Sequence, residues 1–229
     1  CGHCEFCLSG HPSICQTPEV KLPPGVARRL TWKGQHLNQF LNLSSFAEQM
    51  LVHEHALVKV ADDVPLDIGA LVGCGVVTGV GAVFNAARVE AGSTVAVIGC
   101  GGIGLSAVNG AAVAGASRVI AIDTVASKLE IAREMGATDT INASNADAVA
   151  AVRDLTGGGV HYSFEALGSK KTAEQSFEML RPGGLATIIG MVPFGTKIEL
   201  HGADFLSDRK IQGTSMGGNS FRVDMQRML

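Results

Sequence analysis

The sequence predicts an α/β fold built around a doubly wound parallel sheet. Three observations indicate this fold: β-branched apolar runs at 94–98 and 118–122, helix-compatible small residues between them, and repetition of the same alternation with short connections as far as residue 215. Parallel strands that are covered on both faces read as continuous apolar runs, as these two do. We therefore expect right-handed crossovers between successive strands.

The remaining elements of this sheet follow in chain order. We expect strands at 139–142, 160–166, 185–191 and 210–215, and helices at 127–135, 146–155 and 172–180. In such a sheet the ligand binds outside the carboxyl ends of the strands, which here places Gly99, Asp123, residues 166–168 and Gly190 around one crevice. Glu165 also ends a strand; we expect its carboxylate to be exposed or paired and assign it no chemistry.

The turn after the first strand carries a glycine pattern typical of dinucleotide binding. Gly99, Gly101 and Gly104 have the G-x-G-x-x-G spacing, and Asp123 ends the second strand 19 residues after the last glycine. The first glycine permits a tight turn, the second lets the backbone approach a pyrophosphate at a helix N-terminus, and the third lets that helix lie close to the sheet. Asp123 can accept hydrogen bonds from ribose hydroxyls and would repel a 2′-phosphate. The pattern predicts a Rossmann-type domain that binds NAD rather than NADP; the alternative is a structural turn without a ligand.

Four cysteines lie within the first fifteen residues, at positions 1, 4, 7 and 15. Their C-x2-C-x2-C-x7-C spacing suits a tetrahedral structural zinc ion, which would stabilise a loop with little core of its own. An iron–sulfur cluster is the nearest alternative, but ferredoxin motifs place the fourth cysteine after three residues and follow it with proline. Disulfides are the second alternative, although nothing marks the chain as secreted and a cytoplasmic protein keeps its thiols reduced.

Two further cysteines and two histidines are candidates for chemistry. Cys74 lies in a glycine-rich joint and Cys100 within the glycine turn; taken alone, each is most simply a buried thiol. His53 and His55 would share one face of a strand, a spacing that metals can use. We favour the plainer interpretation that they occupy a partly exposed strand edge.

Composition narrows the possible partners. The 229 residues suffice for one large or two modest domains, and a net charge of −3 without a Lys/Arg cluster argues against nucleic acid. Residues 68–87 and 91–117 carry no charge and would be flagged as membrane spans. The second stretch contains the strand, turn and helix described above, and five glycines make the first a poor single helix. We therefore expect both to be buried, with no membrane partner. Because the chain starts on a motif cysteine, we expect a fragment.

Taken together, these motifs identify a family resemblance. The four-cysteine lobe, Gly-Cys-Gly at 73–75 with Thr78 four residues after Cys74, the glycine turn and Asp123 resemble the zinc-containing medium-chain alcohol dehydrogenases. The match continues through Lys-Leu-Glu at 128–130, Met-Gly-Ala-Thr-Asp at 135–139 and Arg-Pro-Gly-Gly at 181–184. The segment between residues 15 and 46 resembles the animal-type, glutathione-dependent formaldehyde dehydrogenase branch, whose members are typically dimers.

The resemblance implies a role for each matching residue. Structural zinc would be held by Cys1, Cys4, Cys7 and Cys15, and Cys74 would be one ligand of a catalytic zinc. Thr78 would lie beside the nicotinamide and Ile103 behind its ring. The cofactor-binding set would be Gly99, Gly101, Gly102 and Gly104 at the pyrophosphate, Asp123 and Lys128 at the adenosine ribose, and the backbone around Ile189 and Met191 at the carboxamide.

The resemblance also implies domains. Residues 1–75 would be part of a β-rich, GroES-like catalytic domain, residues 76–215 the NAD-binding domain, and residues 216–229 the start of a return to the catalytic domain. Family members bring the other catalytic zinc ligands from sequence upstream of the structural lobe, which this chain does not contain.

The implied reaction is hydride transfer between NAD and a primary alcohol or aldehyde, or a hydroxymethyl-thiol adduct, in the cytoplasm. We expect the chain by itself to be incomplete for catalysis and to form a homodimer through an apolar sheet edge at 185–200. Two alternatives remain open: a related zinc dehydrogenase acting on polyols or threonine, and a non-enzymatic NAD(H)-binding module that senses redox state through its cysteine lobe.

Overall fold

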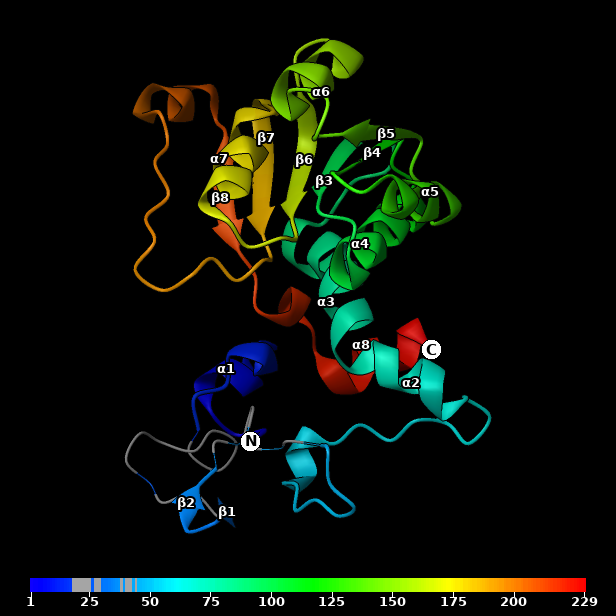
Figure 1. The fold of residues 1–229 in the computed structure, drawn as a ribbon, viewed down its shortest axis with the longest axis vertical. Coiled ribbons are helices and arrows are strands. Elements are labelled where there is room, and N and C mark those ends of the chain that lie inside the picture. Colours follow the sequence, from blue (N-terminus) through cyan, green and yellow to red (C-terminus); the bar gives the residue numbers. More distant parts are fainter. Residues whose placement is uncertain (18–25, 27–29, 38, 40–42, 44) are drawn as a thin grey trace.

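A computed structural model describes residues 1–17, 26, 30–37, 39, 43 and 45–229 (Figure 1). Its largest part is a six-stranded parallel sheet in the order β5-β4-β3-β6-β7-β8. Counted from β3, this is the 3-2-1-4-5-6 order of doubly wound dinucleotide-binding folds, so the predicted fold class is confirmed. The strands are β3 (Thr94–Ile98), β4 (Arg118–Asp123), β5 (Asp139–Asn142), β6 (Val160–Glu165), β7 (Leu180–Ile188) and β8 (Lys210–Gly213).

Helices cover both faces of the sheet (Figure 1). Because side chains alternate along a strand, Val95 and Val97 of β3 enter one buried cluster while Ala96 and Ile98 enter another. The first cluster lies under α4 and α5, and the second under α6 and α7. The helices are α4 (Gly102–Val113), α5 (Ala126–Glu134), α6 (Ala148–Thr156) and α7 (Lys170–Glu178), all within a few residues of the predicted positions.

The strand β7 differs from its prediction in length and place. It begins at Leu180, five residues earlier than expected, because Leu180 pairs with Val160 across a register irregularity. It is also an interior strand, hydrogen-bonded to β6 on one side and β8 on the other. The expectation that 185–200 forms the sheet edge is therefore wrong for β7, since β8 takes that position.

A long apolar helical run precedes the sheet. It comprises α2 (Leu66–Leu71), the π-helical η4 (Val72–Val76), α3 (Val77–Gly81) and the π-helical η5 (Ala82–Ala87). The expectation that its glycines prevent a single helix is wrong, because glycine here serves close packing: a Cβ on Gly79 would overlap the carbonyl oxygen of Ile103 on α4. By length and composition this 22-residue helix could cross a membrane, and 39% of its most apolar window is buried. Helices of this length and apolar composition also occur in the cores of folded domains.

The N-terminal lobe contains α1 (Glu5–Leu8), η1 (Pro12–Ile14), β1 (Thr31–Trp32), β2 (Gln35–His36) and η3 (Glu54–Ala56). The predicted strand through His53 and His55 is wrong: His53 caps the 3₁₀ turn η3, its ring Nδ1 accepting the backbone N–H of His55 at 3.1 Å. This local hydrogen bond competes with extended pairing. Much of the segment between residues 15 and 46, which carried the branch resemblance, lies outside the described residues.

The C-terminal segment folds back onto the long helix through a buried amide. It contains η7 (Met216–Gly218) and α8 (Phe221–Met228), whereas η6 (Gly202–Ser207) comes earlier, between β7 and β8. Asn219 is fully buried; its Nδ2 donates to the carbonyl of Val77 at 2.6 Å and also to that of Met216, while its Oδ1 accepts from Asn85 at 3.0 Å. One side chain thus joins η7, α3 and η5.

Replacing Asn219 should therefore destabilise the protein strongly. Asn219→Leu would remove three hydrogen bonds at a fully buried position, those to the Val77 and Met216 carbonyls and that from the Asn85 amide, which we expect to cost about 2–4 kcal/mol of unfolding free energy. Urea denaturation followed by circular dichroism would measure it. Asn109→Leu, at an exposed amide that donates only to the Met135 carbonyl, is the matched control and should cost less than about 1 kcal/mol. Equal losses in the two variants would contradict the assigned role.

Candidate coenzyme and zinc sites

The topological switch point, where the sequence predicts the ligand crevice, lies between the neighbouring strands β3 and β6. Chain connections leave these two neighbouring strands in opposite directions, and Ala166 N–H donates to the Ile98 carbonyl at 2.9 Å where they end. A dinucleotide lies across such a switch point, one half on each side. The glycine turn of 99–104 lies on the β4 side and the loops after β6 and β7 lie on the other.

Each motif glycine occupies a distinct environment. Gly99 has φ +93°, a conformation that favours glycine, and a Cβ on Gly104 would overlap the Gly99 carbonyl oxygen. Gly101 differs from both: its φ of −81° and ψ of −175° suit any residue, and a Cβ there would meet no atom within 4 Å among the described residues. Gly101 is the N-cap of α4, so there is open space beside the N-terminus of that helix at this residue. Gly102 has the same open surroundings.

Asp123 is held in place by the backbone around it. Its Oδ2 accepts the Cys100 N–H at 2.8 Å and its Oδ1 accepts the Val125 N–H at 2.9 Å. Burial opposes ionisation, but these hydrogen bonds and the charge of Lys128 hold the pKa of Asp123 below its ordinary value. The side chain is thus an ionised acceptor fixed at the end of β4, as a ribose-binding carboxylate needs to be.

The thiols near this crevice differ in exposure. Burial, followed by the charge of Asp123, raises the pKa of Cys100 to about 12, so this thiol is a neutral packing group as expected. Cys74, by contrast, is exposed on η4, which corrects the sequence-based interpretation of a buried thiol. Thr78 follows it on α3 and is nearly buried.

The other side of the crevice is built by backbone. The N–H groups of Ile189 and Gly190 both donate to the Glu165 carbonyl oxygen, at 2.8 and 3.0 Å, which joins the ends of β6 and β7. Met191 is 89% exposed and Ile189 is half-buried. Glu165, to which sequence reasoning gave no chemistry, is fully buried with a hydrogen-bonded carboxylate.

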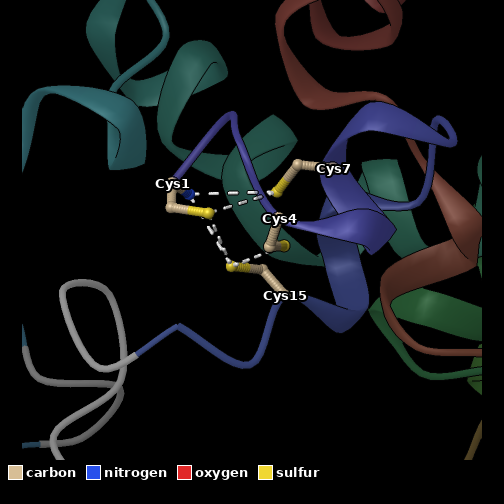
Figure 2. A group of neighbouring side chains, drawn as sticks. All are labelled: Cys1, Cys4, Cys7 and Cys15. Atoms are coloured by element: carbon tan, nitrogen blue, oxygen red, sulfur yellow. Dashed lines mark hydrogen bonds between the residues drawn. The ribbon is translucent and has the colours of Figure 1, made fainter.

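The four N-terminal cysteines converge on one point, as predicted. Figure 2 shows their thiols directed toward one another, and all four sulfurs lie within 4.8 Å of each other. Sulfur–sulfur distances are 3.9 Å for Cys1–Cys7, 3.8 Å for Cys4–Cys15 and 3.7 Å for Cys1–Cys15. A zinc ion bound tetrahedrally at about 2.3 Å from each sulfur would separate its ligands by about 3.8 Å. Disulfide sulfurs lie about 2.05 Å apart, so the geometry fits one zinc ion.

The turns and hydrogen bonds around these cysteines favour metal binding. Cys4 precedes α1 and Cys15 follows η1, so two short turns aim their side chains inward. Thr17 donates its hydroxyl to the Cys1 sulfur at 2.9 Å. Burial raises the pKa of Cys15, but hydrogen bonds from Thr17 and the neighbouring cysteines outweigh it and lower that pKa to about 6. This shift favours the thiolate of Cys15, the form that binds zinc.

Comparison with known proteins shows to which family this chain belongs. The family model of the zinc-binding dehydrogenases matches residues 102–229, more than half of the chain. The chain belongs to this family. Over 236 residues it is 38% identical to S-(hydroxymethyl)glutathione dehydrogenase of Synechocystis sp., covering 100% of this chain and 64% of that protein. A probable S-(hydroxymethyl)glutathione dehydrogenase 1 of Schizosaccharomyces pombe is also 38% identical, covering 98% of this chain and 61% of the relative.

Solved structures agree with this assignment. Benzyl alcohol dehydrogenase from Acinetobacter calcoaceticus superposes with a TM-score of 0.90 at 35% identity, over 100% of this chain and 63% of that one. An alcohol dehydrogenase zinc-binding domain protein from Burkholderia ambifaria gives a TM-score of 0.91 at 35% identity, over 99% of this chain and 63% of its own. The resemblance to the zinc medium-chain dehydrogenases and their glutathione-dependent branch is thus confirmed. The chain spans somewhat less than two thirds of the relatives it matches.

Two features of the site were missed by sequence reasoning. One is the pair of backbone N–H groups, from Cys100 and Val125, that fixes Asp123; the acid itself was found, but its donors depend on how two separate turns meet. The other is the buried carboxylate of Glu165, whose only signal in the sequence is an acid that ends an apolar strand before Ala-Leu-Gly.

The cysteine geometry predicts one tightly bound zinc ion. Cys15→Ser should lose that zinc and lower the melting temperature, because the site supplies folding energy to a lobe with little core. Cys74→Ser is the matched control and should retain it, since Cys74 lies on η4 outside the cluster. Elemental analysis after dialysis against a mild chelator would count the metal. Zinc loss from the Cys74 variant, or iron in place of zinc, would contradict the assignment.

Proposed function

We propose that the chain binds NAD(H) in the crevice between β3 and β6, and that the protein is a zinc-dependent oxidoreductase that transfers hydride between NAD and a primary alcohol or aldehyde. The observation that carries the proposal is Gly101. Neither its backbone conformation nor its surroundings require glycine, because a side chain there would project into open space above the N-terminus of α4. A ligand that needs this space explains the residue, and a pyrophosphate at a helix N-terminus is such a ligand.

The remaining coenzyme contacts are those that the resemblance to the family implies. Asp123 and Lys128 would meet the adenosine ribose, and Gly99, Gly102 and Gly104 would shape the turn. Thr78 and Ile103 would border the nicotinamide, and the backbone of Ile189 and Met191 would meet its carboxamide.

The two proposed zinc roles differ in their support. The structural zinc fits Cys1, Cys4, Cys7 and Cys15. A catalytic zinc supplies Lewis-acid chemistry to an alcohol oxygen and needs three protein ligands. Among the described residues, Cys74 belongs to no convergent group of metal ligands, so this chain alone does not fit such an ion. We therefore expect it to bind NAD(H) without forming NADH from alcohols.

The substrate class rests on chemistry shared by the relatives. S-(hydroxymethyl)glutathione and benzyl alcohol, named in relatives at 38% and 35% identity, both carry a hydroxyl on a primary carbon. A butanediol dehydrogenase matches less well, at 26% identity over 74% of this chain. A primary alcohol or hydroxymethyl-thiol adduct is accordingly our proposed substrate, and a cytoplasmic location suits an enzyme with reduced cysteines.

We also propose the domain limits 1–75, 76–215 and 216–229. The first limit lies inside the continuous helical run from Leu66 to Ala87, and the last lies where η7 returns to α3.

Coenzyme choice tests the proposal. The native chain should bind NADH at least about tenfold more tightly than NADPH, because Asp123 would face a 2′-phosphate. Asp123→Ser should weaken NADH binding by about tenfold and reduce that preference. Asp147→Ser, which removes a carboxylate that caps α6 instead, should leave both affinities unchanged. Fluorescence titration would measure them. Failure of the native chain to bind NADH would contradict the proposal.

A homodimer through the nucleotide domain is a further part of the proposal. The most exposed large apolar side chains in the segment between β7 and β8 are Met191, Phe194 and Leu206, at 89%, 110% and 91%. Light scattering at micromolar concentration should give twice the mass of one chain, and Phe194→Ser should shift it toward one. Leu8→Ser, at an exposed leucine of α1, should leave the mass unchanged. A native chain that scatters as a monomer would contradict this part of the proposal.

A further inference from the structure

The end of β6 contains a buried carboxylate that the proposed reaction does not use. Glu165 is fully buried, and its Oε1 accepts three hydrogen bonds: from Leu167 N–H at 3.1 Å, Gly168 N–H at 2.7 Å and the Thr172 hydroxyl at 2.6 Å. Two of these donors lie in the loop after β6 and the third lies in the first turn of α7. One oxygen atom thus fixes the path of the chain from the strand to the helix.

The same residue also holds the neighbouring loop. Its backbone oxygen accepts the N–H groups of both Ile189 and Gly190, directly after β7. Gly190 lies so close that a Cβ there would be 2.6 Å from the Glu165 Oε2. Glu165 therefore positions two loops from different strands, through its side chain in one and through its backbone and packing in the other.

These two loops also interlock with each other. Gly168 has φ +90°, and a Cβ on it would lie 2.7 Å from the Met191 carbonyl oxygen. A Cβ on Gly190 would in turn overlap the backbone nitrogen of Gly168. Because the loops touch without side chains between them, a change in the first loop displaces the second.

Burying the Glu165 carboxylate costs free energy, which a residue that only ended the strand would not need to spend. Within the described part of the chain, Glu165 Oε2 is buried and has no hydrogen-bond partner. Buried polar atoms are rarely left unpaired in folded proteins, so each one calls for an explanation, a role in a functional site among them. On the same strand, the fully buried Ser163 meets the structural need with a neutral hydroxyl that donates to the Ser176 carbonyl at 2.6 Å.

The position of the two loops in the fold indicates which half of the coenzyme they border. They follow β6 and β7, on the side of the switch point opposite the glycine turn and Asp123. A dinucleotide that lies across this point places its two mononucleotide halves on opposite sides. Asp123 and the glycine turn would take the adenosine half, so the loops after β6 and β7 border the nicotinamide half.

We infer that Glu165 is a positioning residue for the nicotinamide half of the coenzyme: it accepts hydrogen bonds that hold the loops 166–169 and 189–191 in the shape that receives the ring. It does not touch the coenzyme itself. The inference rests on the proposed NAD(H) site and adds that the two halves of the site are fixed by different carboxylates, Asp123 and Glu165.

Two ligands distinguish the two halves of the proposed NAD(H) site. NADH carries both, whereas ADP-ribose lacks the nicotinamide ring. Glu165→Met keeps the length of the side chain but removes the acceptor, so it should weaken NADH binding by about tenfold and change ADP-ribose binding by less than about twofold. Glu165→Gln retains an acceptor oxygen and should bring NADH binding back to within about threefold of the native chain.

A merely structural role would give a different pattern. Ser163→Ala removes a buried hydrogen bond from the same strand, away from the loops, and should leave the ratio of the two affinities unchanged. Should Glu165→Met fail to fold, Thr172→Val removes one of the three donors at nearly constant volume and should still weaken NADH relative to ADP-ribose.

Competition and direct titration, read by NADH fluorescence, would measure both affinities. Equal weakening of NADH and ADP-ribose in the Glu165 variants, or no weakening of either, would overturn the inference while leaving the proposed function intact. A native chain that binds neither probe would instead overturn the proposed function.

Discussion

The close approach of α4 to the end of β3 is the constraint on which the rest of the structure depends. It exists because Gly104 has no side chain where it meets the carbonyl oxygen of Gly99. The same type of contact then continues outward: Gly79 of α3 meets Ile103 of α4, and Gly217 of η7 lies against Thr78, where a Cβ would be 2.7 Å from its carbonyl oxygen. A series of glycine contacts thus connects the crevice to the long helix and to the C-terminal return.

The two carboxylates at the ends of β4 and β6, Asp123 and Glu165, have complementary roles. Asp123 has each oxygen occupied by one backbone N–H, which leaves it ionised and able to accept from further donors at the rim. Glu165 is fully buried and directs its hydrogen bonds into the loops themselves. One acid would therefore contact the coenzyme while the other shapes what contacts it. The cysteine lobe depends on a different principle, since its short turns gain their stability from a metal.

Much of this arrangement could be predicted from the sequence. Continuous β-branched runs predict a parallel sheet, because that packing buries both faces of such strands, and the glycine spacing predicts the tight turn after β3. The cysteine spacing likewise determines a mononuclear site. Predictions failed where tertiary contacts decide. Five glycines in 68–87 weaken a helix in isolation, yet two of them, Gly79 and Gly81, allow α3 to pack closely against α4 and Asn219. His53 and His55 alternate like strand residues, but a local side-chain cap gives a 3₁₀ turn.

We propose that Gly101 is glycine because of a ligand and not because of the fold. The most direct measurement is the NADH affinity of Gly101→Val together with its urea unfolding. The structure has room for this side chain, so the variant should unfold within about 1 kcal/mol of the native chain but bind NADH at least about a hundredfold more weakly. Native-like NADH binding, or loss of stability without a specific loss of binding, would contradict the account.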